Sequence, residues 1–282
     1  MEFFVLLFQY FLLSLLLCAF AVSSNTVVCN GLIPSGQSGM SAHSQHNSLD
    51  FENEIQYLKT GTTIVGICCL DGVVLGADTR STGGPLIMDK NKLKIHDVSD
   101  RIYCCAAGTS ADCDQVSRIT KRIIAMNRNE QILAEDGDNL DSIFHSIHSI
   151  SNLLFDRSRH RKAESSFIIG GIDNSGPSLH QITEDGTNRV GFAALGSGSI
   201  DALAILETKR KEWGEPLQNY GYLSAHGDDE KLIERICVDD AIDVVRQAVR
   251  GGIMNDLGSG SHIDICVIRK DSVDKWREES NK

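Results

Sequence analysis

The sequence has little positive charge and lacks a strong basic patch. Its 27 lysine and arginine residues are outnumbered by 38 aspartate and glutamate residues, which gives a formal net charge of -11 at pH 7. Proteins that bind nucleic acid without sequence preference neutralise its phosphates with clustered lysine and arginine. The composition therefore predicts no nucleic-acid partner.

The cysteines also lack the pattern of a disulfide framework. There are nine of them, an odd number, and two adjacent pairs, Cys68-Cys69 and Cys104-Cys105, fall in strand-like segments. Neighbouring side chains in a strand point to opposite faces of the sheet, which does not suit the regular bridges of a small secreted domain. We expect reduced, buried thiols and a chain that stays in the cytoplasm.

The stretch before residue 62 lacks the hydrophobic period of a folded core. Residues 3–22 are almost wholly apolar, as in a secretory signal or a short membrane anchor, but the charged residue before them is Glu2, with no lysine or arginine. We assign no role to this apolar head, residues 1–22. A membrane-tethered or secreted protein remains an alternative that the head alone supports. Residues 23–61 are rich in serine, glycine, asparagine and glutamine and are predicted to be a disordered, removable propeptide.

A folded domain is predicted over residues 62–282, and the dipeptide Gly61-Thr62 marks its start. The Thr62 hydroxyl can attack the unhindered Gly61 carbonyl, move the acyl group from nitrogen to oxygen and, after hydrolysis, leave Thr62 as a new N-terminus. An α-amine with a pKa of about 7.7–8.0 can then take the hydroxyl proton, which makes such a threonine a nucleophile. On its own, however, Gly-Thr-Thr more often simply enters a strand.

Strand-like and helix-like segments follow in separate blocks. Asp71-Gly72 between two apolar runs predicts a hairpin. Segregated blocks of strands and helices indicate an α+β fold. The expected strands are 64–70, 73–77, 93–95, 101–106, 166–172, 178–183, 190–195 and 262–269. Two of the expected helices are 199–212 and 238–249. Two more are marked by apolar stripes: one begins at Ser110 and has the stripe Val116, Ile119, Ile123 and Met126, and the other has the stripe Ile143, Ile147, Ile150 and Leu154.

Asp78 and Lys94 are candidates for a pair beside Thr62. Asp78 ends an apolar run, so its carboxylate is expected to be buried and paired, and Lys94 is the cation available from the next strand pair. A lysine near Thr62 lowers the proton affinity of the hydroxyl, and an aspartate keeps that lysine charged and oriented. A purely structural salt bridge is the alternative, and it is the commoner role of a lone Asp and Lys.

A set of specific motifs carries a resemblance to a known family. They are Thr62-Thr63-Ile64-Val65-Gly66, Asp71-Gly72-Val73-Val74-Leu75-Gly76-Ala77-Asp78-Thr79-Arg80, Lys94-Ile95-His96, Ile102-Tyr103-Cys104-Cys105, Ala107-Gly108-Thr109, Gly196-Ser197-Gly198-Ser199 and Asn255-Asp256-Leu257-Gly258-Ser259-Gly260-Ser261. In these residues the chain resembles the proteasome beta subunits, and among them the trypsin-like catalytic type. The resemblance implies the four-layer αββα sandwich of the N-terminal nucleophile hydrolases, and a threonine endopeptidase activated by self-cleavage at Gly61-Thr62.

The resemblance also implies roles for individual residues. Thr62 would be the nucleophile and its freed amine the base, with Lys94 and Asp78 tuning the hydroxyl. The backbone amide of Gly108, at a strand-to-helix turn, would stabilise the oxyanion. The residues expected to orient the amine and a nearby water are Ser197, Asp256 and Ser259; as isolated motifs, such Gly-Ser stretches are more often loops or helix caps.

Substrate preference is predicted from the residues of one pocket. Asp114 matches the acidic position that lines the primary pocket of the trypsin-like subunit, Asp89 is expected to add negative charge, and Thr82 is expected to contact substrate. An acidic pocket favours cleavage after arginine or lysine. Alternatively, Asp114 merely complements a helix dipole. Two departures weigh against basic preference: Ala106 replaces a usual glycine and shortens the pocket by about one methyl group, and the Lys92 cation can repel a basic side chain.

No metal or organic cofactor is expected. His145 and His148 have helical metal-ligand spacing but lack an acidic or cysteine partner nearby, so we interpret them as solvated. The resemblance implies that the chain works with other alpha and beta subunits in stacked seven-membered rings, on unfolded polypeptides, in the cytoplasm and nucleus and away from membranes. The segment 209–236 is expected to be a surface insertion. The alternative function is that of a noncatalytic ring subunit.

Overall fold

The computed structural model describes residues 61–133, 142–160, 165–212 and 236–280. The predicted apolar head, all of the predicted propeptide except Gly61, and most of the predicted insertion lie outside these residues.

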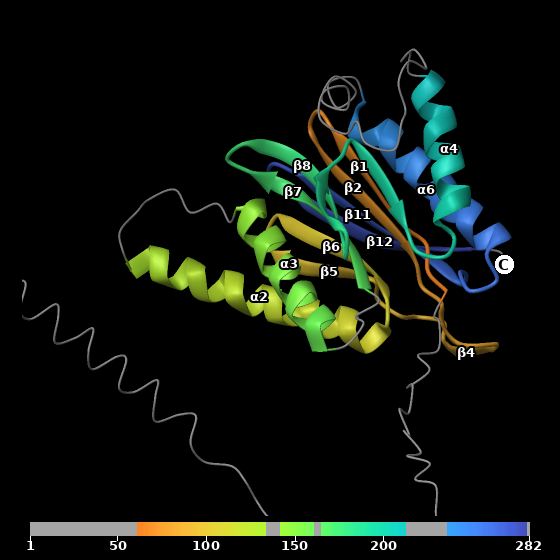
Figure 1. The fold of residues 1–282 in the computed structure, drawn as a ribbon. Helices are drawn as coiled ribbons and strands as arrows, with labels where there is room; N and C mark the ends of the chain where they lie inside the picture. Colours follow the sequence, from red (N-terminus) through yellow and green to blue (C-terminus); the bar gives the residue numbers. More distant parts are fainter. Residues whose placement is uncertain (1–60, 134–141, 161–164, 213–235, 281–282) are drawn as a thin grey trace, which may run out of the picture. The chain divides into compact units, whose positions relative to one another are not determined.

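Two antiparallel sheets form the centre of the fold (Figure 1). The first sheet has the strand order β10-β1-β2-β11-β12. The second sheet has the order β5-β6-β7-β8-β9, so its strands follow one another along the chain. The strands of the first sheet are β1 (Ile64–Cys69), β2 (Gly72–Asp78), β10 (Phe192–Leu195), β11 (His262–Arg269) and β12 (Val273–Glu279), and those of the second are β5 (Ile95–Ser99), β6 (Ile102–Gly108), β7 (Ser165–Asp173), β8 (Gly176–Thr183) and β9 (Gly186–Arg189).

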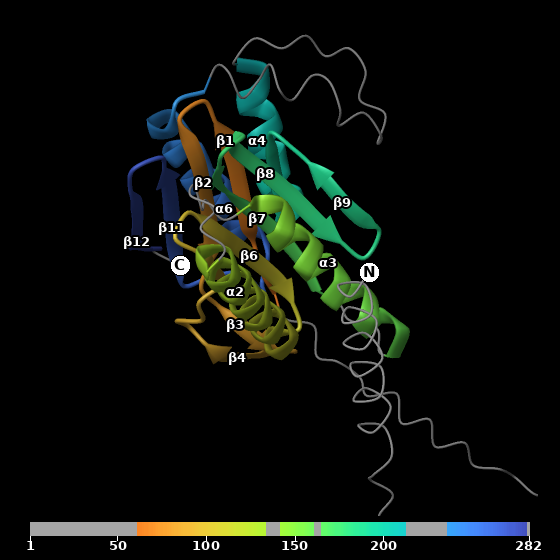
Figure 2. The same cartoon turned by 90° about the vertical axis from the view of Figure 1, so that its left-hand side faces the viewer.

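Helices cover the outer face of each sheet, as Figures 1 and 2 show from two sides. Helices α2 (Ser110–Leu133) and α3 (Ile143–His160) lie on the second sheet, and helices α4 (Ser199–Glu212) and α6 (Val238–Asn255) lie on the first. The result is an αββα sandwich of four layers, which confirms the predicted fold class. The described residues after Gly61 are thus organised around two sheets, each covered by helices on its outer face.

The position of strand β1 in the fold explains why its sequence is continuously apolar. All six of its residues are buried. Val65, Ile67 and Cys69 point to the layer with α4 and α6, while Ile64 and Cys68 point to the layer between the sheets. Successive side chains of a strand alternate between faces, so a strand covered on both sides needs apolar residues at every position.

Most predicted elements are confirmed, with shifts at their ends. The hairpin at Asp71-Gly72 joins β1 and β2, and the predicted helix 199–212 coincides with α4. Helix α6 continues to Asn255 rather than ending near residue 249, and β5 begins at Ile95, so Lys94 lies just before the strand. The predicted stripe of α3 is buried throughout.

The predicted stripe of α2 is partly wrong. Met126 is exposed, whereas Ile124 is buried. Two small polar residues, Ser117 and Thr120, are buried on the same helix, and the Ser117 hydroxyl donates a hydrogen bond to the Cys113 carbonyl 2.8 Å away. That bond satisfies the buried Ser117 hydroxyl, whereas the Thr120 hydroxyl has no hydrogen-bond partner among the described residues.

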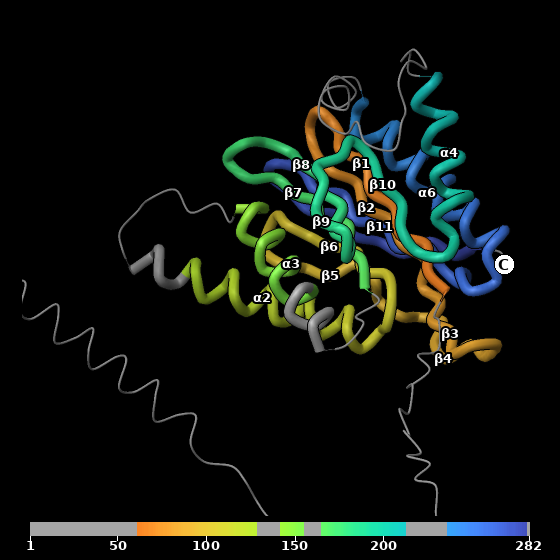
Figure 3. The backbone as a smooth tube through the Cα atoms, viewed as in Figure 1, coloured from red at the N-terminus to blue at the C-terminus, as the bar shows by residue number. Residues whose placement is uncertain are grey.

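The structure contains strands that the sequence analysis did not predict. These are β9, β12 and the hairpin of β3 (Ser81–Gly83) and β4 (Leu86–Asp89), visible at the edge of the fold in Figure 3. Every residue of β4 and of β9 is exposed. Leu86, Ile87 and Met88 of β4 thereby form an exposed apolar hairpin strand.

The described cysteines are free, and all of them except Cys237 are buried. Burial raises the pKa of Cys68, Cys104 and Cys266 to about 12. These thiols therefore remain protonated at neutral pH and fill the core as small apolar groups. Within the described ranges, no helix is long and apolar enough to cross a membrane.

Candidate active site

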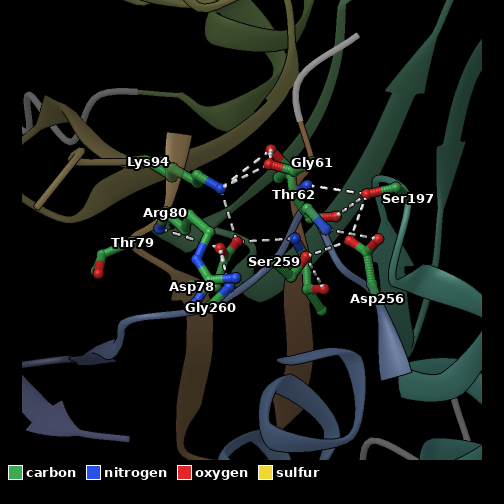
Figure 4. Close-up of polar contacts among 12 residues, drawn as sticks. Gly61, Thr62, Asp78, Thr79, Arg80, Lys94, Ser197, Asp256, Ser259 and Gly260 are labelled. Atoms are coloured by element: carbon green, nitrogen blue, oxygen red, sulfur yellow. Dashed lines mark hydrogen bonds and ion pairs between the residues drawn. The ribbon is translucent and has the colours of Figure 1, made fainter. Parts of the chain in front are cut away.

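Thr62 is buried two residues before β1, next to the peptide bond that links it to Gly61 (Figure 4). Its hydroxyl donates a hydrogen bond to the Gly61 carbonyl oxygen at 2.7 Å. The Lys94 ammonium lies 3.1 Å from the Thr62 hydroxyl oxygen and 3.3 Å from the Gly61 carbonyl oxygen. One cation therefore contacts both the candidate nucleophile and the oxygen that gains negative charge when that carbonyl is attacked.

Asp78 holds Lys94 in this position. The ammonium donates to one Asp78 carboxylate oxygen at 2.7 Å, and both side chains are almost fully buried. The backbone amide of Thr63 donates to the same oxygen at 2.8 Å, and the amide of Gly260 donates to the other at 3.0 Å. Strand pairing explains the placement, since β2 carries Asp78 between β1 and β11. The predicted pairing of Asp78 with Lys94 is thus present beside Thr62.

Burial and pairing act in opposite directions on this pair. Burial lowers the pKa of the Lys94 ammonium and raises the pKa of the Asp78 carboxyl, and the attraction between the two charges opposes both shifts. A lysine whose pKa is lowered gives up a proton more readily than a surface lysine. The hydrogen bond with Asp78 opposes that loss, so Lys94 can act as a cation beside the Thr62 hydroxyl.

Ser197, Asp256 and Ser259 meet on the other side of Thr62. The Thr62 nitrogen donates to the Ser197 hydroxyl oxygen at 3.0 Å. The hydroxyls of Ser197 and Ser259 donate to one Asp256 carboxylate oxygen at 2.6 and 2.7 Å. Partial burial raises the pKa of Asp256, but these bonds and two backbone amides outweigh it and hold that pKa below its usual range. An ionised Asp256 therefore holds the Ser197 hydroxyl in place, and the oxygen of this hydroxyl accepts the hydrogen bond from the Thr62 nitrogen.

Thr63 is a site residue that the sequence analysis missed. Its side chain is fully buried, and its hydroxyl lies 2.8 Å from the Ser259 hydroxyl. Because the single Ser259 proton goes to Asp256, Thr63 is the donor in this contact. Thr63 thus joins both halves of the site, with its amide on Asp78 and its hydroxyl on Ser259. Its only signal in the sequence is a second hydroxyl residue directly after Thr62.

A small pocket opens beside Thr62. Its volume is about 20 Å³, which is room for about one water molecule. Gly61, Thr62 and Lys94 line it, as do the predicted pocket residues Ala106 and Asp114 and the predicted oxyanion residue Gly108. Gly108 ends β6 with a φ of 132°, a backbone angle that favours glycine.

Two predicted substrate residues lie elsewhere. Asp89 is exposed on β4, where its carboxylate accepts a hydrogen bond from the Asn91 amide, and it is not among the residues that line the pocket. The Thr82 hydroxyl accepts a hydrogen bond from the Gly61 amide at 3.0 Å, so Thr82 contacts the residue before the nucleophile rather than the pocket.

Lys92 enters the pocket and contacts Asp114. Its ammonium lies 2.5 Å from one Asp114 carboxylate oxygen, and His96 lies 3.8 Å from the other. The sequence analysis expected Lys92 to oppose a basic substrate, and the structure adds that Lys92 forms an ion pair with the acid itself.

His145 and His148 are exposed on α3, in line with their interpretation as solvated residues. Among the residues that the structure describes, no group of three or more His, Cys, Asp or Glu side chains is arranged to hold a metal ion.

The sequence matches a known family and several characterised proteins. A profile described as "Proteasome subunit" matches residues 58–217, more than half of the chain. Proteasome subunit beta type-7-B of Arabidopsis thaliana is 39% identical over 216 residues, covering 76% of this chain and 68% of the relative. Proteasome subunit beta type-2 of Saccharomyces cerevisiae is 34% identical over 210 residues, covering 74% of this chain and 69% of the relative.

The chain belongs to the proteasome beta subunits. The matched region begins just before Gly61-Thr62 and includes Asp78 and Lys94. Membership in this family of protease subunits agrees with the αββα fold and confirms the family resemblance found in the motifs around Thr62.

Proposed function

We propose that this beta subunit is a threonine endopeptidase that activates itself by cleaving the bond between Gly61 and Thr62. The observation that carries the proposal is the placement of the Thr62 hydroxyl, which contacts both the Gly61 carbonyl and Lys94 inside a buried network. In that network Lys94 contacts the Thr62 hydroxyl oxygen, and Ser197 accepts a hydrogen bond from the Thr62 nitrogen.

Self-cleavage follows from this arrangement. The Thr62 hydroxyl oxygen adds to the Gly61 carbonyl carbon, and Lys94 stabilises the charge on the carbonyl oxygen. The bond from that carbon to the Thr62 nitrogen then breaks, and the nitrogen takes up the proton that the hydroxyl released. Water hydrolyses the resulting ester and leaves Thr62 with a free amine.

The free amine then serves as the base for substrate. Ser197 accepts a hydrogen bond from this nitrogen in the uncleaved chain, and Asp256 fixes the hydroxyl of Ser197. The amine takes the Thr62 hydroxyl proton as the oxygen attacks a substrate carbonyl, and that proton leaves with the departing amine of the substrate. Gly108 borders the same pocket and is our candidate donor to the substrate oxyanion.

The N-terminal residue of the mature chain tests this proposal. Intact mass and terminal peptide mapping of the protein from cells should show a chain that begins at Thr62, and Thr62→Ala should leave the precursor uncut. A wild-type chain that keeps residues before Thr62 has its amine locked in a peptide bond. That result would overturn the catalytic proposal in favour of a noncatalytic ring subunit.

We also propose that the subunit assembles with other alpha and beta subunits into stacked rings of seven that act on unfolded polypeptides. The proteins it resembles are named as proteasome subunits. The exposed apolar side chains of β4 fit a surface that assembly covers. Affinity purification of the full chain should recover it with those subunits in the cytoplasm and nucleus, whereas recovery in membrane fractions would contradict this assignment.

The basic-residue preference expected from Asp114 requires that acid to be available to a substrate. In the structure Asp114 is paired with Lys92, so a basic substrate side chain has to compete with Lys92 for this carboxylate.

A further inference from the structure

The pocket beside Thr62 is the place where a substrate side chain meets the enzyme. In self-cleavage the attacked carbonyl belongs to Gly61, and Gly61 itself lines the pocket. The same hydroxyl later attacks a substrate carbonyl in the same position. The residue that supplies this carbonyl therefore lies at the mouth of the pocket.

Asp114 is the only acidic side chain among the described residues that line this pocket. Three cationic side chains, Arg80, Lys92 and Lys94, line it as well. Lys94 is held by Asp78, but Lys92 has its 2.5 Å contact with Asp114. The acid that would receive a basic substrate side chain already has a basic partner from its own chain.

The remaining groups near Asp114 do not restore a free negative charge. Burial lowers the pKa of His96, although Asp114 raises it, and a neutral imidazole leaves the balance between Lys92 and Asp114 unchanged. The other lining positions include the apolar side chains of Ala106 and Cys113, both buried. The pocket therefore combines a neutralised acid with apolar walls and has room for little more than a water molecule.

We propose that Lys92 determines specificity by occupying Asp114, so that the enzyme cleaves after compact uncharged side chains in preference to arginine or lysine. This inference rests on the proposed peptidase function. An arginine or lysine of the substrate has to displace Lys92 from Asp114, which leaves two cations facing one carboxylate. An uncharged side chain leaves the ion pair intact and contacts the apolar walls.

The partial exposure of the ion pair makes this arrangement adjustable by mutation. The Lys92 side chain is 23% exposed and that of Asp114 is 41% exposed, so water can replace Lys92 without leaving a buried, uncompensated charge. A shorter neutral residue at position 92 both enlarges the pocket and frees the carboxylate. The change should therefore create a preference for basic residues rather than merely damage the enzyme.

The test uses the assembled particle with fluorogenic peptides that differ only in the residue before the cleaved bond, which is alanine, arginine or glutamate. Subtracting the rates of particles that carry Thr62→Ala removes hydrolysis by neighbouring subunits. We expect the wild type to cleave the alanine peptide best, and we expect Lys92→Ser to raise kcat/KM for the arginine peptide about tenfold relative to alanine, as for one hydrogen bond to a charged group.

Two further variants complete the test. Asp114→Asn added to Lys92→Ser should abolish the gain on the arginine peptide. Lys90→Ser replaces an exposed lysine of the same segment that does not line the pocket, and it should leave the ratio unchanged.

The outcomes separate this inference from the function on which it rests. A wild-type preference for arginine or glutamate, or an unchanged ratio in an active Lys92→Ser particle, overturns the role of Lys92 while the peptidase function stands. Absence of any Thr62-dependent hydrolysis overturns both.

Discussion

Two lysine–aspartate pairs flank Thr62, and they differ mainly in burial. The Lys94 and Asp78 side chains are 6% and 0% exposed, whereas those of Lys92 and Asp114 are 23% and 41% exposed. The contact distances are similar, at 2.7 and 2.5 Å. Similar geometry therefore carries different energetics, because removing a partner from a buried pair strands a charge away from water, while an exposed pair is solvated when broken.

The difference in burial corresponds to a difference in proposed role. In the buried pair, Asp78 accepts three more hydrogen bonds from backbone amides and holds Lys94 against Thr62, the proposed nucleophile. The pocket pair lines the proposed substrate pocket and is partly exposed. A catalytic group has to remain in place, whereas a group that selects substrate can vary without loss of the fold.

The largest effect is expected from removing the same charge in each pair. Lys94→Met leaves Asp78 buried without its cation and should destabilise the full-length precursor by about 3–5 kcal/mol and block self-cleavage. Lys92→Met should cost less than about 1 kcal/mol, because its partner remains solvated. Urea denaturation of both precursors, each made with Thr62→Ala so that none is cleaved, measures the comparison. Equal losses of stability in the two variants would contradict the assigned difference in burial energetics.

Gly61→Ala tests whether the position of the Gly61 carbonyl beside the Thr62 hydroxyl is needed for self-cleavage. A Cβ atom at position 61 would lie 2.0 Å from the Gly258 Cα atom, so the backbone before Thr62 has to shift and carry the carbonyl away from the hydroxyl. We expect self-cleavage to slow at least about a hundredfold, as for a 1 Å misplacement of reacting groups. The precursor-to-mature ratio on mass spectrometry follows this.

A matched control distinguishes cleavage from a damaged site. A chain produced so that it begins directly at Thr62 lacks residue 61 and should be fully active in the particle. Inactivity of that chain would show that the mature site itself does not work, and normal processing of Gly61→Ala would show that the close approach to Gly258 is not limiting.

A moderate effect is expected from Thr63→Val, which keeps the side-chain shape but removes the hydroxyl. The fully buried Ser259 oxygen then loses the hydrogen bond that it accepts from Thr63, at an expected cost of about 1–3 kcal/mol. The buried lysine pair does not depend on this hydroxyl, so self-cleavage should persist. Denaturant midpoints and terminal mapping measure the two effects separately, and an unchanged midpoint would contradict the donor role of Thr63.

The sequence predicts the fold where apolar patterns are long. The core strands β1 and β2 and the stripe of α3 were predictable because both faces of the sheets and one face of the helix need apolar side chains. Helix α2 offered two overlapping stripes. The one that is buried contains Ser117 and Thr120, because small side chains permit close packing against the sheet, and hydrophobicity alone favours the stripe that ends at Met126.

The short edge strands could not be predicted for a related reason. All residues of β9 and β4 are exposed, so burial on a sheet face imposes no pattern on them: β9 has no apolar residue, and the apolar run of β4 is only three residues long. Tertiary pairing determines these strands, and the pairing partner of β9 is β8.

The site, like the fold, could be predicted only in part. The motifs predicted that Asp78, Lys94, Ser197, Asp256 and Ser259 gather at Thr62, and each has a contact there. The sequence analysis predicted that Lys92 repels a basic substrate side chain, but it did not predict the ion pair of Lys92 with Asp114. A sequence does not show which of several nearby charges a flexible lysine contacts. Thr63 was missed because a buried hydroxyl just before a strand has no distinctive pattern.

The smallest expected effect concerns pH and a third carboxylate, Asp256. Its hydrogen bonds with Ser197 and Ser259 hold its pKa below the usual range, whereas burial raises the pKa of Asp78. A lowered native pKa means that the unfolded chain binds a proton first as the pH falls. The stabilisation is therefore fully present above the unfolded pKa of about 3.9 and is lost as the pH falls through the lower native pKa.

Asp256→Asn should remove this dependence. Because the side chain is partly exposed, we expect the variant precursor to be less stable by under about 1 kcal/mol at pH 6 than the precursor with Asp256, when both carry Thr62→Ala to prevent cleavage. The difference should shrink steadily below about pH 4, because the wild-type carboxylate becomes protonated while the amide does not titrate. Urea midpoints at pH 6, 5, 4 and 3.5 measure it, and a difference that widens on acidification would mean that Asp256 resembles the buried Asp78 rather than a solvated, hydrogen-bonded anion.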